Sequence, residues 1–311
     1  AFDKYFKGEP AIKHWYGKII ADNNSRAMAI ESGDIDLIET HTNVPASNLP
    51  MLQEANGVVV EKTDFEKVGS IILNNKLPEL SDKRVRKALA YAVDYDWLIE
   101  TITNGAGYAT ECAYLGHKTT GFSSASSITH YNYDLEKAKE LMAEAGYPNG
   151  EGFPVVEYLY NTSDAHKAVA EALQYMWETE LGVTVTLNNQ EWAVFLQTRK
   201  DGDYSIARNG WIADYNDPMS FLDMWLTGGG NNDAQYVNPE YDALIQAAKS
   251  TTDPAERMQA MHDAEDIIIG QDWALNPLYF YTQKYMISDR INGMYYTPLG
   301  YFFFTYAQPN A

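Results

Sequence analysis

The chain has 311 residues, of which 45% are hydrophobic, enough for a large core in two domains or in one large one. Its formal net charge of −20 would repel phosphate backbones, which argues against nucleic acids and anionic membranes as partners. The single cysteine, Cys112, excludes an internal disulfide and a metal site built on cysteines. No apolar run reaches the length of a transmembrane helix.

The first third of the chain predicts a β-α-β opening followed by a strand and two helices. Apolar and polar residues alternate as in strands, and Asp, Asn and Ser residues stand where helices would begin. The predicted elements are a helix over 26–31, strands over 35–38 and 58–60, a strand from residue 69, a helix capped by Ser81-Asp82, and a helix from 94 to 102. Residues 105–133 lack periodicity, and so long a loop is typical of a binding or docking surface.

The middle of the chain predicts parallel strands joined by helices. After a helix that starts at Asp134, strands and helices alternate, which implies parallel neighbours with right-handed crossovers. The predicted elements are strand 155–160, a helix capped by Asp164, strand 183–187, helix 191–200 and strand 204–208. A helix over 218–226, helices over 239–250 and 253–269, and strands near 278–287 and 301–306 complete the chain.

One stretch, Ala207–Pro218, carries a cation, an indole and an anion within seven residues: Arg208, Trp211 and Asp214. We expect it to connect a strand to a helix, where α/β folds place groups that meet ligands. Such a set could hold a zwitterion. It could also be a surface Arg–Asp pair beside a core tryptophan, and the spacing alone favours this second interpretation.

The sequence predicts no catalytic residue, no metal site and no cofactor. The six histidines form no His-x-x-x-His pattern, and no Gly-x-Ser-x-Gly turn is present. Gly228–Gly230 lacks the Lys-Ser/Thr that completes a phosphate-binding loop, and the Asp-rich stretches lack calcium-loop spacing. A hydrolase that uses two carboxylates remains open, because these groups need only meet in space.

The chain resembles the bacterial extracellular solute-binding proteins of family 5, the periplasmic oligopeptide-binding subunits of ATP-driven (ABC) importers. The resemblance is specific around Trp211–Asp214, generic elsewhere, and extends over essentially the whole chain. It implies an α/β, periplasmic-binding-protein-like fold (type II, cluster C) with two lobes of mixed sheet flanked by helices. The segments that carry it are Tyr160–Lys167, Asn189–Trp192, Leu196–Arg199, Ala207–Pro218, Asp82–Leu89 with Asp94–Asp96, and Arg26–Asp36.

The resemblance also implies roles for six residues. Asp214 would accept the α-ammonium of a peptide, and Trp211 and Trp192 would line side-chain pockets. The peptide C-terminus would meet Arg208, Arg199 or His166, depending on peptide length. The physical chemistry agrees, because a buried ammonium needs a carboxylate and the planar guanidinium fork suits a terminal carboxylate.

The resemblance implies that the chain is the C-terminal part of a longer protein. Residues 1–68 with 283–311 would form part of lobe I, and 69–282 would form lobe II complete. Any lipid anchor would lie upstream, and the location would be the periplasm or the outer face of the cytoplasmic membrane. The implied partners are an oligopeptide, a permease and an ATPase, and the implied state is a monomer without enzymatic activity. The same fold with a dipeptide, a sugar, a nickel complex or a signalling peptide remains an alternative.

Overall fold

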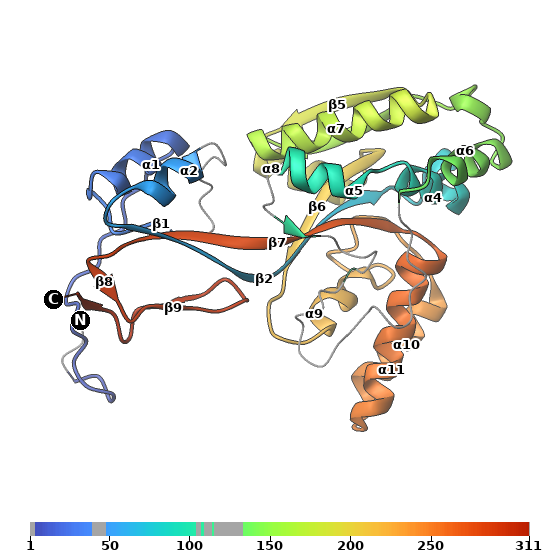
Figure 1. Cartoon of the computed structure of the whole chain (residues 1–311). Helices are drawn as coiled ribbons and strands as arrows, with labels where there is room; N and C mark the ends of the chain where they lie inside the picture. The colour runs from blue at the N-terminus through green and yellow to red at the C-terminus, as the bar shows by residue number, and fades with distance from the viewer. Residues whose placement is uncertain (1–3, 39–47, 104–106, 109–113, 115–132, 311) are drawn as a thin grey trace. The chain divides into compact units, whose positions relative to one another are not determined.

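The computed structural model describes residues 4–38, 48–103, 107–108, 114 and 133–310. The chain divides into two compact units. Unit 1 comprises residues 1–65 and 282–311, and unit 2 comprises residues 66–281. Two strands run through the boundaries, β2 (Val58–Leu73) and β7 (Leu275–Ser288), so the chain passes between the units twice within regular structure (Figure 1).

Unit 1 is a small unit in which two helices pack on short antiparallel pairings. Asp22 caps the first helix by accepting a hydrogen bond from the backbone N of Ser25 (2.7 Å), which satisfies one of the free N–H groups there. Its elements, besides the outer parts of β2 and β7, are α1 (Asn23–Glu31), β1 (Leu37–Ile38), α2 (Leu49–Glu54), β8 (Ile291–Asn292), β9 (Tyr295–Tyr296), β10 (Phe302–Phe303) and β11 (Gln308–Pro309). The predicted strand over 301–306 is therefore only two residues long.

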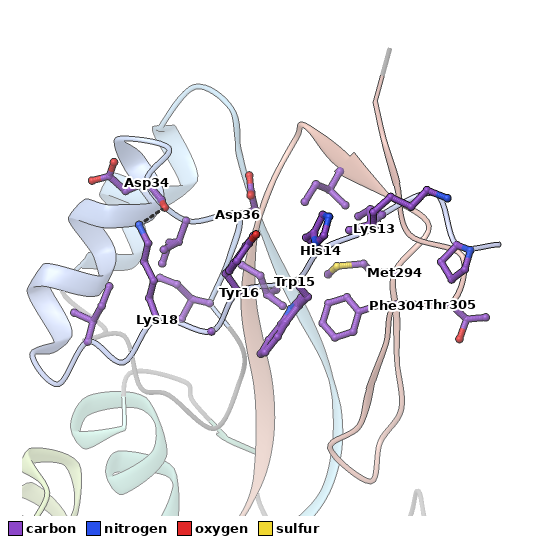
Figure 2. A pocket seen from close by; sticks show the side chains of 18 of the residues that line it. Lys13, His14, Trp15, Tyr16, Lys18, Asp34, Asp36, Met294, Phe304 and Thr305 are labelled. Carbon is purple, nitrogen blue, oxygen red and sulfur yellow. Dashed lines mark hydrogen bonds between the residues drawn. The ribbon is translucent and has the colours of Figure 1, made fainter. Parts of the chain in front are cut away.

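Unit 1 also contains a cavity of about 950 Å³. Figure 2 shows Trp15, Tyr16, Met294 and Phe304 among the residues that line it. The ring centroids of Trp15 and Phe304 lie 6.1 Å apart, yet Trp15 and Tyr16 remain 69% and 81% exposed. The cavity thus combines exposed aromatic side chains with charged ones, among them Lys13, Lys18 and Asp36.

Unit 2 is built on a mixed sheet in the order β7-β2-β6-β4-β5, with β3 (Gly107–Tyr108) pairing β7. β4 (Val156–Asn161) runs parallel to both β5 (Val185–Gln190) and β6 (Ile206–Ile212). These pairings confirm the parallel neighbours expected from the alternation of strands and helices. β2 pairs with β6 in antiparallel orientation, with Ile71 opposite Arg208.

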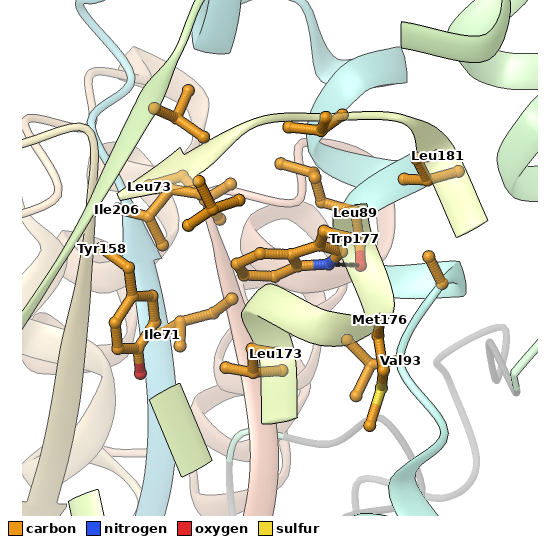
Figure 3. Packing of buried hydrophobic residues seen from close by; sticks show 14 of the residues in the cluster. Ile71, Leu73, Leu89, Val93, Tyr158, Leu173, Met176, Trp177, Leu181 and Ile206 are labelled. Carbon is orange, nitrogen blue, oxygen red and sulfur yellow. Dashed lines mark hydrogen bonds between the residues drawn. The ribbon is translucent and has the colours of Figure 1, made fainter. Parts of the chain in front are cut away.

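Helices bury the sheet of unit 2 through a large apolar cluster. Trp177 stands at its centre, and its indole N–H donates to the carbonyl of Leu89 at 2.9 Å (Figure 3). This bond lets a buried tryptophan satisfy its one polar atom. The helices of unit 2 are α3 (Pro78–Ser81), α4 (Lys83–Tyr91), α5 (Tyr95–Trp97), α6 (Leu135–Glu144), α7 (Asp164–Leu181), α8 (Trp192–Asp201), α9 (Met219–Leu222), α10 (Pro239–Ser250) and α11 (Pro254–Glu265), together with π-helical turns at Leu98–Ile102 and Asp266–Gln271 and 3₁₀ turns at Pro148–Gly150 and Asp223–Trp225.

Three predictions need correction. β2 is one strand of 16 residues where two were expected, because the charged residues between the apolar ends are part of the pleat. β6 continues to Ile212, so Arg208 and Trp211 lie within a strand rather than on the connection after it. Ser163, not Asp164, occupies the N-cap of α7. The expected loop over 105–133 lies outside the described residues except at 107–108, 114 and 133.

Candidate functional site

The second half of β6 presents an open backbone edge. Two hydrogen bonds at the ends of the β2–β6 ladder show which residues of β6 bond to β2. The backbone N of Ala213 donates to the carbonyl of Glu66, and the backbone N of Asn74 donates to the carbonyl of Ser205. Residues at odd positions of β6 therefore bond to β2, and those at even positions point away from it. On that other side the pairing with β4 ends at Leu159–Ala207. Among the described residues, no strand pairs with β6 beyond this point, which leaves the peptide groups of Gly210 and Ile212 facing outward.

The side chain of Arg208 lies in a group of polar residues on one face of the sheet. We define the Arg208 cluster as Lys67, His166, Arg208, Tyr279 and Tyr281. The Nζ atom of Lys67 lies 4.1 Å from the ring centroid of Tyr281, and the two tyrosine hydroxyls are 3.3 Å apart. Arg208 donates a hydrogen bond to the Tyr281 phenol. The cluster thus joins β2, β6, β7 and the first turn of α7.

Close packing in the Arg208 cluster depends on two glycines. A Cβ at Gly210 would come within 2.8 Å of the Arg208 Nη2 atom, so the guanidinium lies over Gly210. A Cβ at Gly69 would lie 3.0 Å from the Tyr281 ring, which is tighter than ordinary van der Waals contact. Because Gly69 and Gly210 have no side chains, there is space for the guanidinium and the phenol to meet.

The two cations shift the pKa values of their neighbours. Burial alone would raise the pKa of Tyr281, but Lys67, Arg208 and hydrogen bonds from Tyr279 and Arg208 lower it to about 8. Burial, with a further contribution from the charge of Arg208, lowers the pKa of Lys67, against an opposing effect of Tyr281. The cluster is therefore a region of positive potential in which a phenol is close to ionising.

His166 is held in its neutral form. Burial, followed by the charge of Arg208, lowers its pKa to about 3, although a hydrogen bond to the carbonyl of Asn161 opposes the shift. The Nδ1 atom lies 3.4 Å from that carbonyl, which can only accept, so this nitrogen carries the proton. The Nε2 atom is then an acceptor, and it can reach a ligand carboxylate only through a water or after taking up a proton.

Asp214 and Trp211 are positioned by one buried residue, Ser220 in α9. The indole N–H of Trp211 donates to the Ser220 carbonyl (2.7 Å), and the backbone N of Asp214 donates to the Ser220 hydroxyl (2.8 Å). Asp217 fixes the same loop through a two-pronged ion pair with Arg257, at 2.8 and 2.9 Å. The Asp214 side chain itself is exposed, and no hydrogen bond to its carboxylate is found among the described residues.

Arg199 has a different environment from Arg208. Its Nε lies 2.7 Å from the Asp233 carboxylate, with both side chains only 13% exposed, and its Nη1 donates to Asn209 at 3.1 Å. Asn209 precedes Gly210 on β6 and points to the face opposite Arg208. The structure therefore places Arg199 and Arg208 on different faces of the same strand.

Trp192 opens α8 and is 51% exposed, stacked on Phe195 with ring centroids 5.8 Å apart. α7 and α8 both begin after parallel strands, and Thr162 bonds to Asn189 and Gln190 between these connections. Trp192 and His166 thus lie near one edge of the sheet, where the carboxyl ends of β4, β5 and β6 meet. None of the six predicted site residues lines the cavity of unit 1.

Sequence reasoning missed Lys67 and Tyr281. Alternation along β2 would have placed Lys67 opposite the predicted stretch, had the strand been recognised as continuous. In the part of the chain that the structure describes, no three His, Cys, Asp or Glu residues gather as a metal site. No described helix is both long and apolar enough to cross a membrane.

Comparison with known proteins places this architecture in a family. The model for bacterial extracellular solute-binding proteins, family 5 Middle, matches residues 1–233. The oligopeptide-binding protein OppA of Bacillus subtilis is 30% identical over 299 residues, which are 94% of this chain and 54% of that protein. The periplasmic oligopeptide-binding protein OppA of Salmonella typhimurium is 34% identical over 266 residues, which are 84% of this chain and 48% of that protein.

A solved structure agrees. The periplasmic oligopeptide-binding protein OppAIV of Borrelia burgdorferi superposes with a TM-score of 0.81 at 30% identity, over 94% of this chain and 57% of that one. This confirms the periplasmic-binding-protein-like fold predicted from the sequence. The chain spans about half the length of the curated relatives that it matches. The match over residues 1–233 shows that the chain belongs to the bacterial extracellular solute-binding proteins of family 5.

Proposed function

We propose that the protein captures short peptides for an ABC importer and performs no chemistry on them. One observation carries the proposal: the open edge of β6 at Gly210 and Ile212 has a cation, Arg208, at one end and an anion, Asp214, at the other. An extended peptide can add to such an edge through its backbone, as in β-augmentation. Its carboxylate would meet Arg208 and its ammonium Asp214, so the peptide would run antiparallel to β6.

The spacing along β6 supports short peptides. Asp214 lies six positions after Arg208, and a strand rises about 3.3 Å per residue, so the backbone path is roughly 20 Å. The Arg208 guanidinium lies over Gly210, toward Asp214, which shortens the distance between the two charges. The first and last Cα atoms of tri- to pentapeptides are roughly 7–14 Å apart when extended. Peptides of this length fit between the two charges, and side-chain pockets at Trp211 and Trp192 would accept varied residues.

The names of the relatives support the proposed partners and location. The three relatives described above are named as oligopeptide-binding proteins, two of them as periplasmic. We infer the same compartment for this protein, or the outer face of the cytoplasmic membrane if a lipid anchors it. We also infer a monomer that delivers its ligand to a permease and an ATPase. We also propose that residues 1–68 with 283–311 are part of lobe I and that residues 69–282 are lobe II, a division supported by the two compact units.

Peptide titration of the complete gene product tests the proposal. Asp214→Asn is expected to weaken binding of free tri- to pentapeptides by about 10- to 100-fold, the effect of losing a charge-assisted hydrogen bond. N-acetylated peptides should bind both proteins equally weakly, and Asp203→Asn, a change at an exposed Asp just before β6, should behave as wild type. Asp214→Asn that binds free peptides as tightly as wild type contradicts the ammonium assignment.

The ligand class has its own test. Native mass spectrometry of protein purified without denaturation would reveal by mass a dipeptide, a sugar, a nickel complex or a signalling peptide in place of an oligopeptide. Incubation of the complex for hours should return the peptide uncleaved. Cleavage would point to a carboxylate-based hydrolase.

A further inference from the structure

Lys67 is a second cation in the peptide-carboxylate region. It lies on β2 opposite Ile212 and shares a face with Gly69, because alternate residues of a strand point the same way. The Tyr279 and Tyr281 rings contact that face over Gly69. Arg208 reaches the same phenol from β6. Two cations on neighbouring strands thus converge on one tyrosine.

The path of the Arg208 side chain explains how the charges converge. Arg208 is opposite Ile71, four residues along β2 from Lys67, which is roughly 13 Å of strand. The guanidinium closes part of this distance by lying over Gly210, toward the Lys67 end. The Lys67 ammonium closes the rest by packing 4.1 Å from the Tyr281 ring centroid. The phenol therefore lies within reach of both charges.

The charge of the cluster favours an anionic ligand. None of the ion pairs found among the described residues includes Arg208. His166 stays neutral and adds no charge of its own. Like charges in a half-buried site repel each other more strongly than in water, so an arriving carboxylate gains attraction and relieves this repulsion.

We propose that Lys67 and Arg208 bind the two carboxylates of one C-terminal residue, which makes the protein selective for peptides that end in Asp or Glu. Arg208 takes the α-carboxylate at the end of the open β6 edge. Lys67 takes the side-chain carboxylate, and the Tyr281 hydroxyl, which accepts a hydrogen bond from Tyr279, donates its own proton to the same carboxylate. The inference rests on the proposed function and names its substrate class.

Calorimetric titration of the complete gene product with Ala-Ala-Glu and Ala-Ala-Gln tests this selectivity. Wild type should bind the Glu peptide about tenfold more tightly, the effect of one partly desolvated charge pair. Lys67→Met should bring the dissociation constants of the two peptides within about twofold of each other. Lys67→Arg keeps the charge and should keep the preference. Lys62→Met, a change at an exposed Lys of the same strand, is the matched control and should behave as wild type.

A spectroscopic readout separates binding at the cluster from binding elsewhere. Saturation with Ala-Ala-Glu should move the ionisation of Tyr281 to higher pH, followed by phenolate absorbance, because the ligand carboxylates offset the cations that favour the phenolate. Tyr281→Phe should remove that ionisation. Equal affinity of wild type for the two peptides, or a Glu preference that survives in Lys67→Met, would overturn the inference and leave the proposed function standing. Failure of wild type to bind either peptide would overturn both.

Discussion

The two arginines that lie on opposite faces of β6 have different partners. On one face Arg199 is paired with Asp233 at 2.7 Å and bonded to Asn209, with little of either charged side chain exposed. On the other face Arg208 meets a lysine and a pair of tyrosines, and it has no carboxylate partner among the described residues. The family resemblance assigned both to the C-terminus of a peptide.

The difference teaches that residue type does not decide a ligand role by itself. The charge of Arg199 is already neutralised by Asp233, and this ion pair holds α8 to the loop that contains Asp233. To bind a ligand it would have to share or leave Asp233. The charge of Arg208 is not paired with a carboxylate among the described residues, and Arg208 lies beside an open strand edge. We therefore expect Arg199 to act mainly on stability and Arg208 mainly on binding.

The largest expected effect is on stability, from Arg199→Met. It leaves the Asp233 carboxylate buried without its cation, which should lower the free energy of unfolding by about 3 kcal/mol in urea denaturation. Burial already raises the pKa of Asp233 against the opposing charge of Arg199, so the loss should shrink as the pH falls and Asp233 takes up a proton. Adding Asp233→Asn should restore part of the stability. A stable Arg199→Met that has lost peptide binding would reverse the assignment of the two faces.

Arg208→Met should give the converse result. Peptide affinity should fall by about 10- to 100-fold through loss of the charged contact, measured by calorimetry. The free energy of unfolding should change by less than about 1 kcal/mol, because no buried carboxylate loses its partner. Large destabilisation together with unaffected binding would show that this arginine, too, is structural.

The smallest effect concerns pH. As the pH rises through about 8, the Tyr281 phenol ionises and places a negative charge beside Arg208 and Lys67, where it repels a ligand carboxylate. Peptide affinity should therefore fall above pH 8, by up to about tenfold per unit. Tyr281→Phe should flatten this part of the profile. Loss of the Lys67 proton also weakens binding at high pH, and the decline that remains in Tyr281→Phe measures it.

The parallel part of unit 2 could be predicted because each strand and helix there carries its own periodicity and caps. α10 has the predicted bounds, with Asn238 as its cap and Pro239 at its first position. β2 could not be predicted as one strand, because its central charged residues resemble a loop when read alone. They become a strand only through pairing with distant partners.

The candidate site likewise contains residues that the sequence predicted and residues that it did not. The sequence marked Arg208, Trp211 and Asp214 because they lie in one continuous stretch. The Arg208 cluster also needs Lys67 and Tyr281, which lie 141 and 73 residues away along the chain and meet only through the register of β2 and β7 with their neighbours. The pairing of Arg199 with Asp233, across 34 residues of irregular spacing, has no local signal either.

The insertion of unit 2 within unit 1 has a consequence for synthesis. A ribosome that has made residue 65 must add all of residues 66–281 before the remaining part of unit 1 begins. At about 5–20 residues per second this takes roughly 10–40 s, during which unit 2 can be completed while unit 1 cannot. The apolar residues that pack with Met286, such as Ile38, lack this partner for that interval, so we expect a nascent chain stalled before residue 282 to bind a chaperone through residues 1–65.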